Sequence, residues 1–170
     1  MNTEDYERQK YKALWHNNDY VSNSAINWGN YLSSILTGKC LDIGCGDCTT
    51  MQILNGVKGI ECEGLDIVTD QCPAGTVVHC APAWRMPVRD KAYAYSFSTD
   101  VLEHLPTGFV KAALVEIGRV TRVKTYHYIA TKPAVTTYEG KQVHLTVKPI
   151  EWWRVMFNRY CDVDYELKWW

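Results

Sequence analysis

The sequence predicts an α/β fold: a doubly wound, mostly parallel sheet with helices on both faces. From residue 39 onward, short apolar runs alternate with stretches of helical periodicity, an order typical of consecutive βαβ units. The first run passes directly into a glycine turn at Gly44 and Gly46, and the second ends in Asp66, where open sheets of this kind bind ligands. Because no linker-like stretch interrupts the chain, we expect one compact domain, residues 1–170.

A helical segment, residues 1 to about 37, precedes the predicted sheet. Its second half carries apolar residues at the i, i+3, i+4, i+7, i+8 spacing of a helix with one buried face. These residues are Trp28, Tyr31, Leu32, Ile35 and Leu36. Tyr11, Leu14 and Trp15 indicate a shorter helix before it. The charged residues of that shorter helix are expected to form its solvated face: Glu7, Arg8 and Lys10.

Strands and further helices follow in alternation. The candidate strands are residues 39–43, 60–66, 75–79, 92–98 and 123–130. Between the last two, Thr107 can cap a helix. The buried stripe of that helix is Phe109, Val110, Ala113, Leu114, Ile117 and Val120. Pro149 suits the first turn of another helix, whose apolar residues are Trp152, Trp153, Met156 and Phe157.

The last residues alternate between apolar and charged side chains. The apolar ones are Cys161, Val163, Tyr165, Leu167 and Trp169, and they are separated by Asp162, Asp164, Glu166 and Lys168. A period of two predicts a strand with one solvated face. We place this strand at an edge of the sheet, which its charges would help to protect from pairing with another chain.

Charge and composition exclude several classes of function. The chain has 18 Lys+Arg against 19 Asp+Glu, so no field of one sign favours nucleic acid or an anionic membrane as a partner. No apolar run reaches the roughly 18 residues that span a bilayer. We therefore expect a soluble, cytoplasmic protein that acts on a small molecule. Its oligomeric state is left open.

The seven cysteines are interpreted as free thiols. One pair, Cys45 and Cys48, has the Cys-x-x-Cys spacing of half a zinc site or of a redox pair. No second pair of cysteines and no pair of histidines completes a tetrahedral set in the sequence. The prediction is therefore that the protein holds no metal.

The glycine turn and the acid after it suit a nucleotide-type ligand without phosphates. Glycine lets the backbone turn sharply and approach a ligand, and the helix behind the turn offers free N–H groups. A pyrophosphate loop would need a third glycine where the chain has Thr49. Asp66 follows Gly46 by 66 − 46 = 20 positions, which places a carboxylate where it can accept two hydrogen bonds from a ribose.

These motifs resemble those of class I S-adenosylmethionine-dependent methyltransferases. The resemblance rests on Leu41 to Cys48, on Asp66, and on the run Ser98-Thr99-Asp100-Val101-Leu102-Glu103-His104-Leu105-Pro106, and it is greatest for small-molecule enzymes such as those of ubiquinone biosynthesis. It implies a Rossmann-like methyltransferase fold that binds S-adenosyl-L-methionine. The implied cofactor-binding residues are Asp42, Gly44, Cys45 and Gly46 around the methionine, Asp66 at the ribose, Ile67, Ala83 and Trp84 at the adenine, and Ser98 and Thr99 on the floor.

The sequence departs from the family pattern at three places. The third glycine of the first motif falls at Cys48, a substitution that ordinary helical angles would accommodate. The acid that usually receives the adenine amino group is replaced by Pro82 or a neighbour, so Trp84 is expected to cover the adenine. Family members commonly end with a seventh, antiparallel strand; here either that strand is absent or one predicted strand is miscounted.

Two histidines are candidates for the acceptor side of the site. His104 follows the fourth predicted strand, at the edge where open sheets bind ligands. His144 lies in a long connection that also holds Tyr138 and Glu139, and long connections in compact domains are often functional. His144, and next to it His104, is therefore the candidate general base, with Tyr138 and Glu139 available to orient the acceptor. Aromatic residues of the first segment are candidates for a lid over the cofactor sulfonium: Tyr11, Trp15 and Tyr20.

The combined prediction is methyl transfer from S-adenosylmethionine to an oxygen or nitrogen atom of a small molecule. One alternative is an accessory protein that binds S-adenosylmethionine or S-adenosylhomocysteine without catalysis. Another is a thiol–disulfide oxidoreductase that uses Cys45 and Cys48, because thiolates are stabilised at helix starts.

Overall fold

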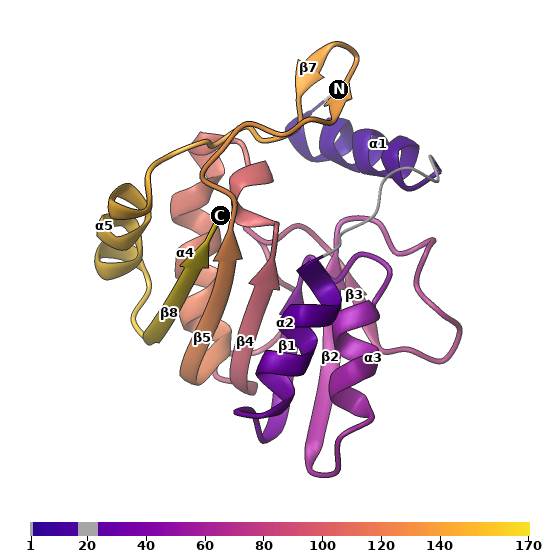
Figure 1. Ribbon diagram of the computed structural model, residues 1–170, viewed down its shortest axis with the longest axis vertical. Helices are drawn as coiled ribbons and strands as arrows, with labels where there is room; N and C mark the ends of the chain where they lie inside the picture. The colour runs from indigo at the N-terminus through magenta and orange to yellow at the C-terminus, as the bar shows by residue number, and fades with distance from the viewer. Residues whose placement is uncertain (1, 17–23) are drawn as a thin grey trace.

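One six-stranded sheet organises the molecule (Figure 1). The computed structural model describes residues 2–16 and 24–170 of the chain. The strands lie in the order β3-β2-β1-β4-β5-β8, and every neighbouring pair is parallel. They are β1 (Gly38–Ile43), β2 (Ile60–Asp66), β3 (Val78–Cys80), β4 (Tyr93–Thr99), β5 (Thr121–Ile129) and β8 (Asp164–Trp169).

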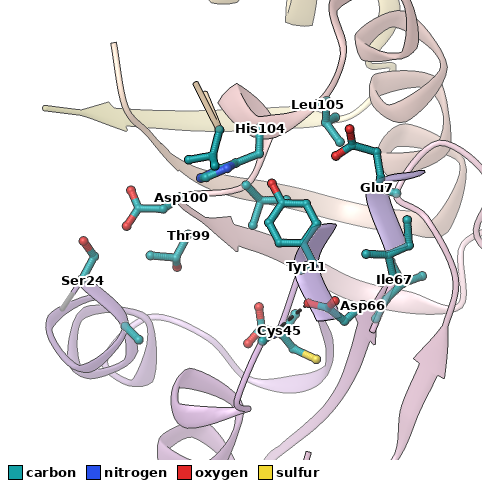
Figure 2. A pocket seen from close by; sticks show the side chains of 18 of the residues that line it. Glu7, Tyr11, Ser24, Cys45, Asp66, Ile67, Thr99, Asp100, His104 and Leu105 are labelled. Carbon is teal, nitrogen blue, oxygen red and sulfur yellow. Dashed lines mark hydrogen bonds between the residues drawn. The ribbon is translucent and has the colours of Figure 1, made fainter. Parts of the chain in front are cut away.

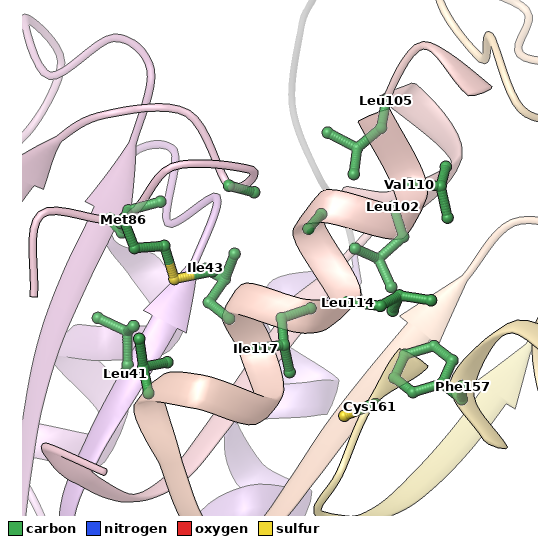
Figure 3. Close-up of a cluster of buried hydrophobic side chains, with 14 of the residues drawn as sticks. Leu41, Ile43, Met86, Leu102, Leu105, Val110, Leu114, Ile117, Phe157 and Cys161 are labelled. Carbon is green, nitrogen blue, oxygen red and sulfur yellow. The ribbon is translucent and has the colours of Figure 1, made fainter. Parts of the chain in front are cut away.

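Helices cover both faces of this sheet, which confirms the predicted doubly wound α/β fold. One apolar cluster joins the sheet to α2 (Ser24–Ser33) and α3 (Thr49–Asn55), and the other joins it to α4 (Thr107–Val120) and α5 (Ile150–Tyr160), as Figure 3 shows in part. Strand β1 serves both clusters because its side chains alternate: Leu41 belongs to one and Cys40 to the other. Burial on both faces is why the consecutive residues Cys40 and Leu41 of this strand are both apolar.

The remaining elements lie near the carboxyl ends of the strands. They are α1 (Thr3–Trp15), the 3₁₀ turn η1 (Leu102–His104) and the hairpin of β6 (Thr137–Tyr138) and β7 (Lys141–Gln142) (Figure 1). Helix α1 begins where Asn2 accepts a hydrogen bond from Asp5 N, as an N-cap does. No helix in the described part of the chain has the length and apolar character needed to cross a membrane.

The third strand is shorter than predicted and begins later. Residues 75–79 were expected to form it, but β3 starts at Val78. Gly75 has a φ of 86°, and Thr76 N donates to Pro73 O at 3.2 Å, so the chain is still turning there. A glycine at positive φ marks a turn more often than a strand.

Three predictions at helix ends need correction. Thr107 is not the cap of α4, because Pro106 takes that position and the Thr107 hydroxyl bonds to Thr146 Oγ1 at 2.9 Å. Ile35 does not belong to the buried stripe, since α2 ends at Ser33 and the Ile35 side chain is exposed. Pro149 caps α5 rather than lying in its first turn.

The last strand lies at the sheet edge, as predicted, but it is shorter than the alternating pattern. Strand β8 starts at Asp164, so Cys161 and Val163 precede it, and it pairs in parallel with β5. Tyr165 and Leu167 pack against the core cluster that includes α4 and α5. Within the described residues no antiparallel strand joins this sheet, so the sheet has six strands there.

Candidate active site

A cleft of about 630 Å³ lies at the carboxyl ends of β1, β2 and β4. This volume is in the range of small-molecule sites, and the position is where open parallel sheets bind ligands. Figure 2 shows Cys45 and Asp66 toward one end of the cleft, Tyr11 across it, and His104 beyond. The cleft therefore has two ends with different chemistry.

The glycine turn after β1 forms the first end. Gly44 and Gly46 have positive φ, and a Cβ on either would collide with a neighbouring side chain, Val101 for Gly44 and Trp15 for Gly46. Only glycine allows the backbone to turn there and helix α1 to pack against it. Gly46 N then donates to Asp66 Oδ2 at 2.9 Å, which links the two predicted motifs directly.

Cys48 does not have the helical angles expected of it. Its φ of 66° and ψ of 17° are left-handed, a conformation that glycine adopts without strain and other residues rarely adopt. The Cys48 side chain is fully buried. The family pattern and the backbone therefore both favour glycine at this position, and the chain has a buried thiol instead.

Two carboxyl groups line this end of the cleft, and burial weakens the acidity of both. Burial raises the pKa of Asp66 to about 6, although Asp66 accepts hydrogen bonds from Gly46 N and Val68 N. Burial, and then the charges of Asp66 and Asp47, raises the pKa of Asp42 well above its usual range. A ligand that brought a cation and hydroxyl donors here would lower both pKa values and favour the ionised carboxylates.

The predicted adenine-side residues also line the cleft. Ile67, Ala83 and Trp84 all contribute to its wall, and the Trp84 ring packs on Phe109 with 4.6 Å between ring centroids. Of the two predicted floor residues, Thr99 lines the cleft. Ser98 does not, because its hydroxyl is buried in the sheet and bonds to His127 Nδ1 at 2.7 Å.

The second end of the cleft brings together His104, His144 and Glu103. The two imidazoles meet edge to face with 4.6 Å between ring centroids, and both line the cleft. His144 Nδ1 donates to the carbonyl of Lys132 at 2.7 Å, so Nε2 is the proton-accepting nitrogen of the neutral ring. Burial, and then the proximity of His144, lowers the pKa of His104 to about 3, so this ring is neutral near pH 7.

Glu103 lies behind these histidines with no exposed surface. Its Oε1 accepts a hydrogen bond from Ala130 N at 2.8 Å, while Oε2 has no partner in the described residues. Burial, and then the charge of Asp100, raises the pKa of Glu103 to about 8. Glu103 belongs to the run around His104, but nothing in the sequence assigned it a role.

Helix α1 closes the cleft, and only some of the residues that it contributes were predicted. Tyr11 and Trp15 line it, whereas Tyr20 lies outside the described residues. Glu7 and Lys10 are buried and form an ion pair at 2.5 Å, so the prediction of a solvated face is wrong for these two. Opposite charges three positions apart are common on exposed helices, and no signal in the sequence marked this pair as buried.

Tyr138 and Glu139 do not reach the cleft. Both lie at the β6–β7 hairpin, where the Tyr138 ring packs against Tyr6 of α1 with 6.3 Å between ring centroids. The cleft wall receives residues 134–136 and 143–144 of this connection instead. The predicted orienting role of Tyr138 and Glu139 is therefore not supported.

The Cys45 and Cys48 thiols are 3.9 Å apart, and a third thiol, that of Cys72, lies beside them. Hydrogen bonding to Cys48 and Cys72 raises the pKa of Cys45 far above its usual value, and the bond from Cys45 lowers the pKa of Cys72 to about 7. A thiol–disulfide oxidoreductase needs an accessible, acidic attacking thiol in its Cys-x-x-Cys pair. Cys45 and Cys48 are both buried, which disfavours that alternative.

Comparison with known proteins gives a family and a fold. The profile of a methyltransferase domain family matches residues 41–129, and no curated protein matches the chain. The 4+2 cyclase SpnF has a TM-score of 0.63 at 17% identity, with 86% of this chain and 61% of that chain covered. Phosphoethanolamine N-methyltransferase 2 of Haemonchus contortus, in complex with S-adenosyl-L-methionine, has a TM-score of 0.62 at 16% identity, covering 92% and 41%.

A third solved structure contains two bound molecules. It is the 1,6-didemethyltoxoflavin-N1-methyltransferase of Burkholderia thailandensis with 1,6-didemethyltoxoflavin and S-adenosylhomocysteine bound, and it has a TM-score of 0.55 at 14% identity, covering 72% and 60%. The present chain spans 41% to 61% of the length of these three proteins. At such identities the likeness shows a shared fold.

The family match covers the part of the cleft that the sheet and its following loops form. Residues 41–129, just over half of the chain, include the glycine turn, Asp66 and the η1 segment with His104. The fold has the parallel sheet and two helical layers of this family. The chain therefore belongs to the class I S-adenosylmethionine-dependent methyltransferase domain family.

Proposed function

We propose that the protein transfers a methyl group from S-adenosylmethionine to an oxygen or nitrogen atom of a small-molecule acceptor. The observation that supports this most is the two-ended cleft, with buried carboxyls beside a glycine turn at one end and two adjacent histidines at the other. The volume of about 630 Å³ suits small molecules rather than a macromolecule. The resemblance to small-molecule enzymes, including those of ubiquinone biosynthesis, supports the same acceptor class.

The first end has the groups needed to hold the cofactor. Asp66 retains lone pairs for two ribose hydroxyls beyond its bonds to Gly46 N and Val68 N. Asp42 can pair with the ammonium group of the methionine, a cation that offsets the burial of its carboxylate. Ile67, Ala83 and Trp84 provide an apolar wall for adenine, and Gly44, Cys45, Gly46 and Thr99 bring backbone close to the methionine.

The second end would receive the acceptor. When bound, S-adenosylmethionine supplies an electrophilic methyl group. His144 Nε2 can take the proton that an acceptor hydroxyl or amine loses as its lone pair attacks, because Nδ1 is held as a donor by the carbonyl of Lys132. The His104 ring lines the cleft beside His144, so it can contact the acceptor. Tyr11 and Trp15 would keep water out.

The proposal is tested by calorimetric titration of the chain with S-adenosylmethionine, S-adenosylhomocysteine and NAD. We expect both sulfur nucleosides to bind, and NAD not to bind, because Thr49 replaces the glycine that a pyrophosphate loop needs. Tight binding of NAD with no response to the sulfur nucleosides would contradict the proposed cofactor.

Asp66→Ala is expected to weaken the binding of S-adenosylhomocysteine by roughly 10- to 100-fold. A hydrogen bond to a charged group contributes about 1.5–3 kcal/mol, and a methyl side chain cannot accept one. In the unaltered protein the affinity should also fall as the pH drops below about 6, since the raised pKa of Asp66 leaves its carboxyl protonated there. Both effects are measured by titration at several pH values.

Asp70→Ala is the matched control for this variant. Asp70 lies four residues away, outside the cleft, and pairs with Lys12 at 2.7 Å. Its loss should leave the affinity for S-adenosylhomocysteine unchanged. Equal affinities for the unaltered protein and Asp66→Ala would remove Asp66 from the ribose site.

A binding protein without catalysis is the second candidate function. One of the structures with a shared fold is named as a cyclase, so the fold by itself does not specify methyl transfer. The two functions differ in turnover. An enzyme converts S-adenosylmethionine to S-adenosylhomocysteine when its acceptor is present, and a binding protein never does.

A further inference from the structure

Three thiols from two separate segments converge behind the glycine turn. Cys45 and Cys48 belong to the turn after β1, and Cys72 belongs to the connection between β2 and β3. The three Sγ atoms all lie within 4.8 Å of one another. The spacing of Cys45 and Cys48 was visible in the sequence, but Cys72 lies 72 − 48 = 24 positions further on and carries no motif.

The spacing of the sulfur atoms fits a metal with thiolate ligands. In a tetrahedral zinc site with Zn–S bonds of about 2.3 Å, neighbouring sulfur atoms are about 3.8 Å apart. The Sγ atoms of Cys45 and Cys48 are 3.9 Å apart. Cys72 Sγ therefore needs to move by less than about an ångström to complete a three-sulfur face around a cation of this size.

The backbone of Cys48 supports a role for its thiol. A non-glycine residue with a φ of 66° is strained, and such strain persists where the surroundings or a function require it. Glycine would relieve the strain but would remove the sulfur atom. The Cys48 thiol lies within the cluster, in contact with Cys45 Sγ and 3.9 Å from Gly46 O.

The surroundings of the cluster leave one side open. Cys72 is only partly buried, so a cation has a route of entry and a position for a water ligand. The Gly46 carbonyl lies 3.5 Å from Cys72 Sγ and also accepts a hydrogen bond from Gln71 Nε2 at 3.1 Å. These contacts already hold the connection against the glycine turn, and they limit the rearrangement that metal binding would require.

We propose that Cys45, Cys48 and Cys72 form a binding site for a thiophilic divalent cation of the zinc type, with its fourth position open to solvent. Soft thiolate ligands select such cations over magnesium or calcium. Binding replaces the three S–H protons with metal–sulfur bonds and releases these protons to solvent, with no oxidation. The cation would link the glycine turn, whose Gly46 N bonds to Asp66, to the connection after β2.

The test uses the full chain, reduced beforehand, freed of the reductant and kept under an oxygen-free atmosphere. Titration with Cd²⁺ should produce a thiolate-to-metal charge-transfer absorption band that saturates at one cation per chain. Competition with a chelating dye gives the affinity for Zn²⁺. Cys72→Ser removes one of the three thiolate ligands and should lower the Zn²⁺ affinity by at least about a hundredfold. Cys72 is chosen because it is the least buried of the three, so its replacement should disturb the fold least. Zn²⁺ should raise the melting temperature of the unaltered protein more than that of this variant.

Cys80→Ser is the matched control. Cys80 is an exposed thiol on β3 whose Sγ accepts a hydrogen bond from Arg8 Nη1 at 3.0 Å, and it is not part of the cluster. Its loss should leave the absorption and the Zn²⁺ affinity unchanged. The proposal is overturned if the unaltered protein shows no thiolate-to-metal absorption, or if Cys72→Ser binds Zn²⁺ as tightly as Cys80→Ser does. Neither readout requires cofactor or acceptor, so the result is independent of the proposed methyl transfer.

Discussion

His144→Ala is expected to lower the turnover of a methyl acceptor by roughly a hundredfold or more. This is the usual contribution of a general base, and His144 Nε2 is the proton-accepting nitrogen of a ring that Lys132 holds in place. The affinity for S-adenosylmethionine should change little, because His144 lies at the end of the cleft that we propose receives the acceptor, away from Asp66 and the glycine turn. Turnover is measured as release of S-adenosylhomocysteine, using a phenol or amine that the unaltered protein methylates.

A structural role for His144 makes a different prediction. The ring also packs against His104 and Trp170, so its loss could act through the shape of the cleft. His144→Asn separates the two roles, because the amide can replace Nδ1 as the donor to Lys132 but has no counterpart of Nε2. If His144 accepts the proton, the asparagine variant is as slow as the alanine variant. Recovery of turnover and thermal stability by asparagine would instead identify His144 as structural.

Glu103→Gln is expected to stabilise the folded protein at pH 7 by about 3 kcal/mol. The pKa of Glu103 is about 8 in the folded protein, against an ordinary value of 4.5, so between these pH values the folded chain holds a proton that the unfolded chain has released. Stability therefore falls as the pH rises through this window, by about 1.4 kcal/mol per pH unit. Glutamine has a similar shape and does not titrate, so the gain should vanish near pH 4.

Glu116→Gln provides a control in which the expected change in stability at neutral pH has the opposite sign. Its carboxylate bonds to Arg119 Nε at 2.6 Å and accepts a hydrogen bond from Met86 N, and the bond to Arg119 lowers its pKa. This variant should lose stability at neutral pH and recover relative to the unaltered protein as the pH falls through the lowered pKa. Urea unfolding from about pH 3 to pH 8 measures both variants, because the lowered pKa of Glu116 lies below its ordinary value of 4.5. A loss of stability in Glu103→Gln that is the same at every pH would contradict the buried, protonated carboxyl.

The destabilisation caused by the buried Glu103 carboxyl marks the histidine end of the cleft as a candidate functional site. A buried carboxyl without a full set of hydrogen bonds destabilises a fold, and such groups gather at functional sites. Glu103 stands in the run around His104, and nothing in that run predicts its burial. Since burial depends on neighbours such as Ala130, 27 positions away, no local pattern could have revealed it.

The sequence by itself determined the fold class and the segments that form the glycine-turn end of the cleft. These follow from local rules: apolar runs of strand length, glycines where φ must be positive, and an acid at the end of the next strand. Gly44, Gly46 and Asp66 are placed by the backbone next to them, so their spacing was enough to bring them together.

Only the tertiary structure decided how distant segments meet. It buried the Glu7–Lys10 pair on a helix that looked solvated, removed Tyr138 and Glu139 from the cleft, and brought Cys72 to Cys45. Each of these depends on which surface packs over the carboxyl ends of the strands, and helical or strand periodicity carries no information about that choice. Packing between elements far apart in the chain is set by the shape and chemistry of both partners together.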